Sequence, residues 1–150
     1  MDDLGTFDTE ALVTLGSDGA AAADPLYASY TGAQVDAAMS RVEFSTALEA
    51  ITRVVTQANR YIEVTAPWKL AKQADHAARL QMVLHVLAEI IRIISITLEP
   101  FMPSVAEAMW RQLGCGTTPR RLADASRWPG LNAGQPIGPH PILFPRGAGA

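Results

Sequence analysis

The sequence of 150 residues has little of what many catalytic and metal sites require. It contains one cysteine, Cys115, and three histidines that are scattered along the chain, His76, His85 and His140. A single cysteine excludes a disulfide framework and a cysteine-rich zinc site, and it is typical of a protein of the reducing cytoplasm. No base is adjacent to Cys115 and it does not open a helix, so we do not expect an activated thiolate. The spacing of the histidines predicts no metal site.

Long uncharged hydrophobic runs are also missing. A membrane-spanning helix needs roughly 18 to 20 apolar residues. In the richest stretch, residues 82–98, Glu89 and Arg92 interrupt the apolar pattern, and Glu99 follows it directly. The N-terminus begins Met1-Asp2-Asp3, with acids where a secretory or mitochondrial targeting segment would carry bases. We therefore expect a cytoplasmic protein without a membrane partner.

The chain lacks the sequence motifs of a self-contained enzyme. It has no glycine-rich phosphate loop, no His-Glu-x-x-His motif and no nucleophile elbow. Its charge is uneven, because residues 1–50 hold nine acidic residues and one basic residue, whereas residues 51–150 hold six acidic and eleven basic residues. This asymmetry leaves binding of a polyanion open, although a charge imbalance of this size is more often an ordinary solvated surface. A small independent enzyme has only the scattered histidines in its favour.

Apolar residues recur with helical spacing through the middle of the chain. Steps of three, four and one between Phe44 and Ile62 predict an amphipathic helix over residues 43–65, which Ala66-Pro67 must end. The same analysis predicts a helix from Thr31 to about Ser40 and a central helix that starts after a cap at Asp75 and ends near Leu98. A further helix is predicted to begin at a capping box formed by Ser104 and Glu107 and to end at Gly114. A short helical segment is predicted over residues 121–126.

Irregular segments are expected on both sides of these helices. Residues 1–30 are predicted to form an irregular acidic lead-in that could belong to a preceding element, and residues 147–150 a short tail. Residues 134–146 are predicted to be extended, either packed on the helices or unpacked. Side chains expected to pack are Trp110, Trp128, Ile137, Ile142, Leu143 and Phe144. The fold predicted over residues 31–146 is all-α, an antiparallel bundle of about four to five helices.

The segment around Trp68 is the most unusual part of the sequence. Trp68 follows the helix-breaking Pro67, so we expect it at a loop apex, flanked by Arg60, Lys69 and Lys72. An aromatic ring beside cations suits a single-stranded RNA loop, since unstacked bases stack on aromatic faces and phosphates pair with basic side chains. Asn59 adds an amide that can donate to and accept from a base edge. Alternatively, Trp68 only fills the space between helices and Asn59 only buttresses the loop.

Four short motifs follow one another in a specific order and spacing. They are Asn59-Arg60-Tyr61-Ile62, Ala66-Pro67-Trp68-Lys69-Leu70-Ala71-Lys72, Leu98-Glu99-Pro100-Phe101-Met102-Pro103 and Trp110-Arg111-Gln112-Leu113-Gly114, with further matches at residues 44–48 and 143–146. Together they resemble the anticodon-binding helical domain of bacterial methionyl-tRNA synthetases, over roughly residues 40–146. Class I synthetases for leucine, valine, isoleucine and cysteine share this helical domain but typically lack the full set of motifs.

The resemblance implies roles for five residues. Pro67 and Trp68 correspond to the pair that takes part in reading the CAU anticodon of the tRNA for methionine. Trp68 would stack on an anticodon base and Pro67 would fix the loop. Asn59, Arg60 and Lys69 would support the loop or contact the RNA backbone. The resemblance also implies a part in aminoacylation of tRNA with methionine.

The sequence lacks several parts that the resembled family contains. The nucleotide-binding domain with its ATP signatures, the earlier anticodon helix and the C-terminal tRNA-binding barrel of some members are all missing from these 150 residues. The chain therefore resembles the C-terminal portion of such a synthetase and should be inactive alone. ATP, with zinc as a second candidate, would bind to a separate catalytic domain or subunit. The competing hypothesis is a stand-alone helical adaptor or remnant that binds RNA non-specifically or docks on a synthetase partner.

Overall fold

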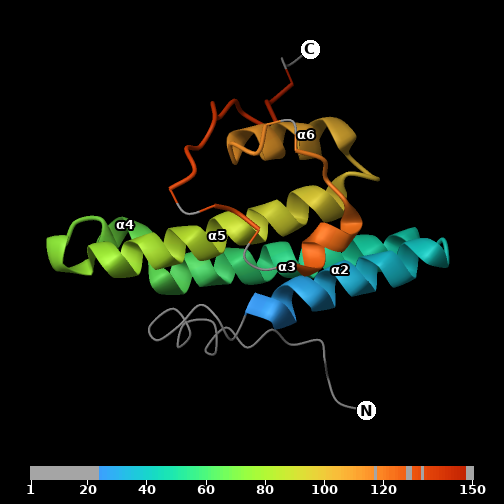
Figure 1. Cartoon of the computed structure of the whole chain (residues 1–150), viewed down its shortest axis with the longest axis horizontal. Coiled ribbons are helices and arrows are strands. Elements are labelled where there is room, and N and C mark those ends of the chain that lie inside the picture. The colour runs from blue at the N-terminus through green and yellow to red at the C-terminus, as the bar shows by residue number, and fades with distance from the viewer. Residues whose placement is uncertain (1–23, 117, 128–129, 133, 148–150) are drawn as a thin grey trace.

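The computed structural model describes residues 24–116, 118–127, 130–132 and 134–147, with side chains described from Thr31 onward. Every regular element in this part is helical (Figure 1), which confirms the predicted all-α class. The elements are α2 (Asp24–Ser40), α3 (Phe44–Thr65), α4 (Pro67–Leu70), η1 (Ala74–His76), α5 (Ala77–Leu98), α6 (Pro103–Gln112) and η2 (Leu122–Ser126), where η denotes a 3₁₀ helix.

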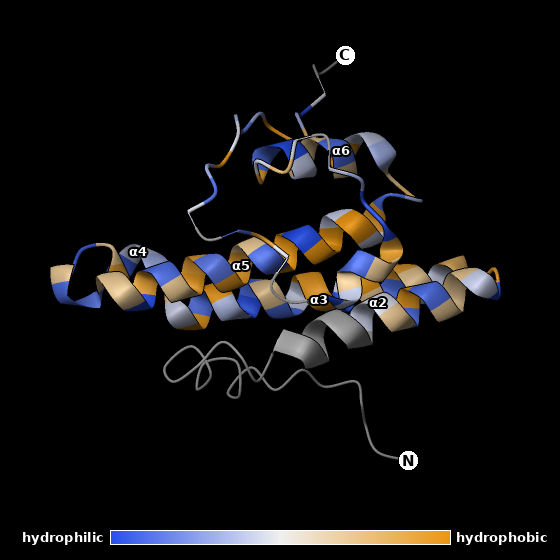
Figure 2. Ribbon diagram, viewed as in Figure 1, coloured by the Kyte–Doolittle hydropathy of each residue, from blue (hydrophilic) through white to orange (hydrophobic). Residues whose placement is uncertain are grey.

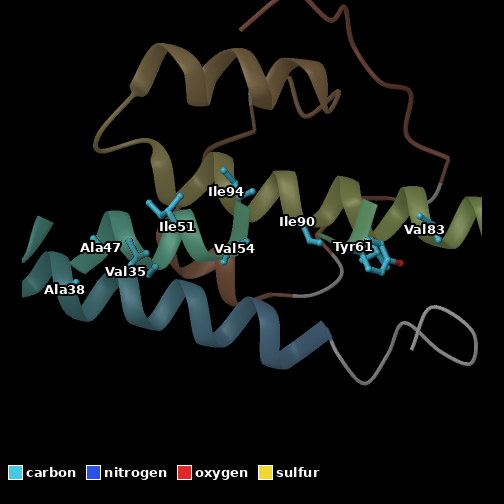
Figure 3. Packing of buried hydrophobic residues seen from close by; sticks show 11 residues of the cluster. Val35, Ala38, Ala47, Ile51, Val54, Tyr61, Val83, Ile90 and Ile94 are labelled. Atoms are coloured by element: carbon cyan, nitrogen blue, oxygen red, sulfur yellow. The ribbon is translucent and has the colours of Figure 1, made fainter. Parts of the chain in front are cut away.

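The three long helices α2, α3 and α5 lie side by side and run in alternating directions, and α6 lies on the opposite side of α5 from α2 (Figure 1). Helix α5 is the centre of the bundle, because it contacts α2, α3, α4 and α6 as well as both 3₁₀ helices. Figure 2 shows that apolar residues continue around α5, as its sequence pattern predicts for a helix with several neighbours. The core between the long helices is formed by residues such as Val35, Val54 and Ile90 (Figure 3).

By length and composition alone, the stretch Ala74–Leu98 could cross a membrane. Ten residues of α5 are buried within the protein, and they include the charged Glu89 and Arg92. The core helix of a globular bundle passes the same hydropathy test, so this stretch is weak evidence for a membrane span.

A buried ion pair on α5 holds the C-terminal part of the chain against the bundle. Glu89 Oε2 accepts a hydrogen bond of 2.6 Å from Arg92 Nε, and the two side chains are 0% and 2% exposed. Their remaining bonds go to backbone groups: Glu89 Oε1 accepts from the N–H groups of Gly130 (2.8 Å) and Leu131 (2.6 Å), and Arg92 donates to the carbonyls of Asp124 (2.9 Å) and Arg127. Because each charged group makes three hydrogen bonds inside the protein, the bundle tolerates their burial.

The ends of α2 and α6 use the same backbone pattern with different residues. Gly114, at φ 72°, ends α6 as predicted. At the end of α2 the left-handed residue is Val42, at φ 61°. The Val42 N–H donates to the Met39 carbonyl (3.0 Å) and the Glu43 N–H donates to the Ala38 carbonyl (2.8 Å), which are the two bonds of a Schellman motif. Sequence patterns do not reveal this turn, because valine rarely adopts a positive φ.

The predicted start of the first helix is wrong. Helix α2 begins at Asp24, so residues 24–30 do not belong to an irregular lead-in, and residues 1–23 lie outside the described part. Pro25 is compatible with the first helical turn, where its missing N–H would have no intrahelical partner. Thr31 is buried inside α2, 2% exposed, and does not cap a helix.

Two predicted caps are also wrong. The residue that precedes α5 is His76, which makes no side-chain capping bond, and Asp75 lies within η1. Helix α6 begins at Pro103, so Ser104 is already inside its first turn and no capping box forms. Proline at the first position needs no cap for its own nitrogen. The Glu107 carboxylate pairs with two arginines instead.

The C-terminal segment is extended, as predicted, but polar bonds hold it. The Gly138 N–H donates to the Gln112 carbonyl (2.9 Å), and Gln112 Nε2 donates to the Pro141 carbonyl (2.8 Å). The predicted packing of apolar side chains is wrong for Ile137, Ile142 and Phe144, which are 77%, 80% and 65% exposed, whereas Leu143 is half-buried. Residues 148–150 of the predicted tail lie outside the described part.

Trp110 packs in the core as predicted. It is 5% exposed and lies in a second buried cluster with Ile93, Ile96 and Ala125. Its indole N–H donates to the Thr118 carbonyl (2.9 Å), which satisfies the polar atom of the ring. Ala125 belongs to η2, which confirms the predicted short helical segment. Trp128, also predicted to pack, is outside the described residues.

Candidate nucleic-acid interface

Helices α3 and α4 meet at a single residue, Ala66, in the left-handed conformation with φ 43°. The Ala66 N–H donates to the Ile62 carbonyl (2.9 Å) and completes α3, and the Ala66 carbonyl accepts from the Lys69 N–H (2.8 Å) and opens α4. Pro67 occupies the first position of α4, where no backbone donor is needed. The backbone hydrogen bonds of the corner are therefore made within the corner itself. The side chains of α4 are not needed for them.

This corner leaves Trp68 exposed. Trp68 lies in the single turn of α4, and not at a loop apex as predicted. Its side chain is 52% exposed and belongs to neither of the described buried clusters. A tryptophan whose only role was to fill space between helices would be buried like Trp110. The structure thus favours a surface role for Trp68, of the kind that base stacking requires.

Unpaired cations lie at the same end of the bundle. Arg60 on α3, Lys69 on α4, and Lys72 and Arg79 on either side of η1 are exposed, and none of them forms an ion pair with a described residue. The arginines that do pair lie elsewhere, namely Arg41, Arg92, Arg111 and Arg120. Cations without an internal acidic partner are the ones that can neutralise phosphates. Sequence analysis counted Lys72 among the cations that flank Trp68 but assigned no role to Arg79.

Asn59 is an exposed residue of α3 that directly precedes Arg60. Its side chain forms no hydrogen bond within the described part of the chain, so it does not buttress the corner as the structural alternative requires. It lines an apolar groove of about 530 Å³ that extends over α3 and α5 and does not include Trp68. Of the five predicted site residues, Asn59 lines this groove and the other four do not.

Metal-ligating and thiol side chains are sparse and scattered among the described residues. They contain no group of three or more His, Cys, Asp or Glu side chains that could hold a metal ion. Burial raises the pKa of the Cys115 thiol, which disfavours the reactive thiolate. What α4 and its neighbours provide is an exposed aromatic ring with nearby positive charge, which suits binding of an unstacked base.

Comparison with known proteins agrees with this geometry. The family described as the anticodon-binding domain of tRNA ligase matches residues 28–135. The methionine–tRNA ligase of Halalkalibacterium halodurans is 39% identical over 119 residues, which is 75% of this chain and 17% of the relative. That of Caldanaerobacter subterraneus subsp. tengcongensis is 39% identical over 113 residues, 75% of this chain and 18% of the relative. The Bacillus subtilis ligase is 42% identical over 77 residues, 51% of this chain and 12% of the relative. The chain spans less than a fifth of the length of these relatives.

Proposed function

Because this chain belongs to the anticodon-binding domain family of tRNA ligases, we propose that it recognises the CAU anticodon of the tRNA for methionine. The curated relatives that it matches are methionine–tRNA ligases, which supports methionine over other amino acids. Since the chain spans less than a fifth of their length, we propose that it acts as the C-terminal anticodon-binding part of a methionyl-tRNA synthetase in the cytoplasm.

The observation that carries this proposal is the exposure of Trp68 on a rigid corner. Pro67 and the left-handed Ala66 set the direction of α4, so the backbone that carries the exposed indole is already folded before RNA arrives. A backbone that is already ordered loses little conformational entropy when a base stacks on its side chain. Lys69 and Arg60 supply positive charge for the phosphates beside that base.

In the proposed mechanism this chain contributes binding and specificity. Correct contacts to the anticodon position the acceptor end of the tRNA at a distant catalytic site, so substitutions here change tRNA use without affecting activation of the amino acid. The described residues contain no cluster of three or more His, Cys, Asp or Glu side chains that could hold a metal ion, and the sequence lacks a phosphate loop. We therefore assign ATP, and zinc as the second candidate, to a separate catalytic domain or subunit.

Binding of an anticodon stem-loop tests the proposal. We expect Trp68→Ala to weaken binding of a CAU stem-loop by about 1–3 kcal/mol, the usual contribution of a base stacked on an aromatic side chain. Phe44→Ala is the matched control, because Phe44 is an aromatic residue that is 51% exposed and lies at the opposite end of α3 from α4. Fluorescence anisotropy with labelled RNA measures both. Equal affinity of the parent and Trp68→Ala would exclude Trp68 as the stacking platform.

A stem-loop with a different anticodon separates the two hypotheses raised by the sequence. The proposed function requires that the CAU loop binds more tightly than a loop of the same length carrying GAU. Equal, weak and strongly salt-dependent binding of both RNAs would favour the helical adaptor or remnant. A protein that co-purifies with the chain would then be the first candidate for its partner.

A further inference from the structure

Helix α4, the single turn that carries Trp68, depends on the rest of the bundle for its stability. It has four residues, Pro67–Leu70, and an isolated helix shorter than about 12 residues is marginal in water. Its first backbone bonds join it to the corner, where the Ala66 carbonyl accepts from the N–H groups of Lys69 (2.8 Å) and Leu70 (3.4 Å). Tertiary packing must supply the remaining stability, so the side chain that anchors α4 decides where the turn lies.

Leu70 is the side chain of α4 that reaches the core. It is half-buried and packs against the core cluster formed by α2, α3 and α5. Trp68 and Lys69 are exposed, and Pro67 at the corner is the only other half-buried residue of the turn. Helix α4 lies against α5 at one end of the bundle (Figure 1). Leu70 is therefore the apolar anchor that holds this turn on the bundle.

The position of the anchor determines which way Trp68 faces. Successive residues of a helix are rotated by about 100°, so Trp68 and Leu70, two residues apart, lie about 200° apart around the axis of α4. Burial of Leu70 therefore directs Trp68 away from the core, in agreement with the 52% exposure of the tryptophan. Loss of the Leu70 contact would release the turn and displace the indole with it.

We propose that Leu70 is a positioning residue for anticodon recognition, which acts through Trp68 without contacting the RNA. The inference rests on the proposed function. Because RNA binding requires α4 in one place, the apparent affinity falls in proportion to the fraction of molecules in which the turn lies there. A chain in which α4 is correctly placed one-fifth of the time binds about fivefold more weakly. Leu70 thus contributes to RNA affinity as well as to packing.

The RNA affinity of two leucine variants tests this role. Leu70→Ala removes the anchor, and Leu87→Ala is the matched control, because Leu87 on α5 is also a half-buried leucine packed against the same core cluster. Both are measured under conditions in which urea unfolding shows the chain to be folded. We expect Leu70→Ala to weaken binding of the CAU stem-loop by about fivefold and Leu87→Ala to change it by less than about twofold. Equal affinities of the two folded variants would overturn the proposal.

A double-mutant cycle shows whether Leu70 acts through Trp68. If the anchor only positions the indole, Leu70→Ala should weaken binding by less than about twofold in a chain that already carries Trp68→Ala, because the two effects are then not additive. The same fivefold loss in both backgrounds would contradict this role. Leu70→Met, which keeps an apolar side chain of similar volume, should restore the affinity of the parent to within about twofold.

Hydrogen exchange reports on the turn itself, without RNA. The Lys69 and Ala71 amides donate to the carbonyls of Ala66 and Pro67. We expect Leu70→Ala to speed their exchange at least about fivefold and Leu87→Ala to leave it unchanged, since the turn opens locally when its anchor is lost. Unchanged exchange in Leu70→Ala would show that the leucine does not hold α4.

Two further comparisons complete the test. Leu70→Val, which shortens the side chain by one methylene group, replaces Leu70→Ala if that variant does not fold, and its shifts should have the same direction. Weaker CAU binding by Trp68→Ala with parental binding by Leu70→Ala would reject the positioning role and leave the anticodon function standing. Parental binding by Trp68→Ala would instead reject the stacking role of Trp68, and with it this inference.

Discussion

The carboxylate of Glu89 and the guanidinium of Arg92 are paired at 2.6 Å, one turn apart on the central helix, in a position that solvent hardly reaches. Between them they bind four backbone groups of the C-terminal segment. Gly130 passes so close to Arg92 that a Cβ on this residue would clash with the guanidinium. The pair thus determines how the chain after α6 returns to the bundle, where η2 also contacts α2.

Removing one member of this pair should be costly. We expect Glu89→Ala to reduce the free energy of unfolding by about 3–5 kcal/mol, because the Arg92 charge and two backbone N–H groups lose their acceptor. Glu49→Ala, at an exposed position of α3, should change it by less than about 0.5 kcal/mol. Urea unfolding followed by circular dichroism measures both. A loss for Glu89→Ala no larger than the control would show that the pair does not hold the segment.

The end of α2 offers a stabilising substitution. Val42 has φ 61°, a conformation that costs a residue with a Cβ about 1–2 kcal/mol and glycine almost nothing. We expect Val42→Gly to raise the free energy of unfolding by about 1 kcal/mol, even after the larger chain entropy of glycine is included. Val64→Gly, within α3, should lower it by about 1 kcal/mol. Thermal unfolding measures both variants, and we expect their melting temperatures to shift in opposite directions.

We expect Lys69 to contribute to RNA affinity through its charge and not to the preference for the CAU sequence. We expect Lys69→Ala to reduce the slope of log binding constant against log salt concentration by about 0.7–0.9, the value for one phosphate contact. The discrimination between CAU and GAU stem-loops should stay unchanged. Arg41→Ala is the control, because Arg41 pairs with Glu43 at the opposite end of α3. Titrations at several salt concentrations give the slopes, and an unchanged slope would remove Lys69 from the interface.

The stability of the protein should depend on Glu107 at acidic pH. Hydrogen bonding from Arg120 holds the pKa of the Glu107 carboxyl below its ordinary value of 4.5, and the charge of Arg111 adds to this effect. A carboxyl whose pKa is lowered by folding stabilises the protein above its ordinary pKa, and that contribution is lost as the pH falls through the lowered value. We therefore expect Glu107→Gln to lose stability near pH 7 and to differ less from the parent below the lowered pKa. Urea unfolding at a series of pH values tests this, and a difference that does not change with pH would contradict it.

Local rules predict most of the helices but not all of their ends. The apolar period and Ala66-Pro67 locate α3 correctly, and Gly114 ends α6 where glycine is expected. The start of α2 and the turn at Val42 are missed, because the first lies in a stretch without a sustained period and the second uses a residue that rarely adopts its conformation. The predicted capping box at Ser104 and Glu107 fails because Pro103 begins the helix one residue earlier.

By itself, the sequence determined the all-α class, the position of the α3–α4 corner and the motifs that place the chain in its family, since helical period, proline and glycine act over a few residues. Only the tertiary structure decided that Trp68 is exposed while Trp110 is buried, that Glu89 and Arg92 pair inside the core, and that Asn59 faces an apolar groove. Burial depends on which distant surfaces meet, and a local pattern does not contain that information.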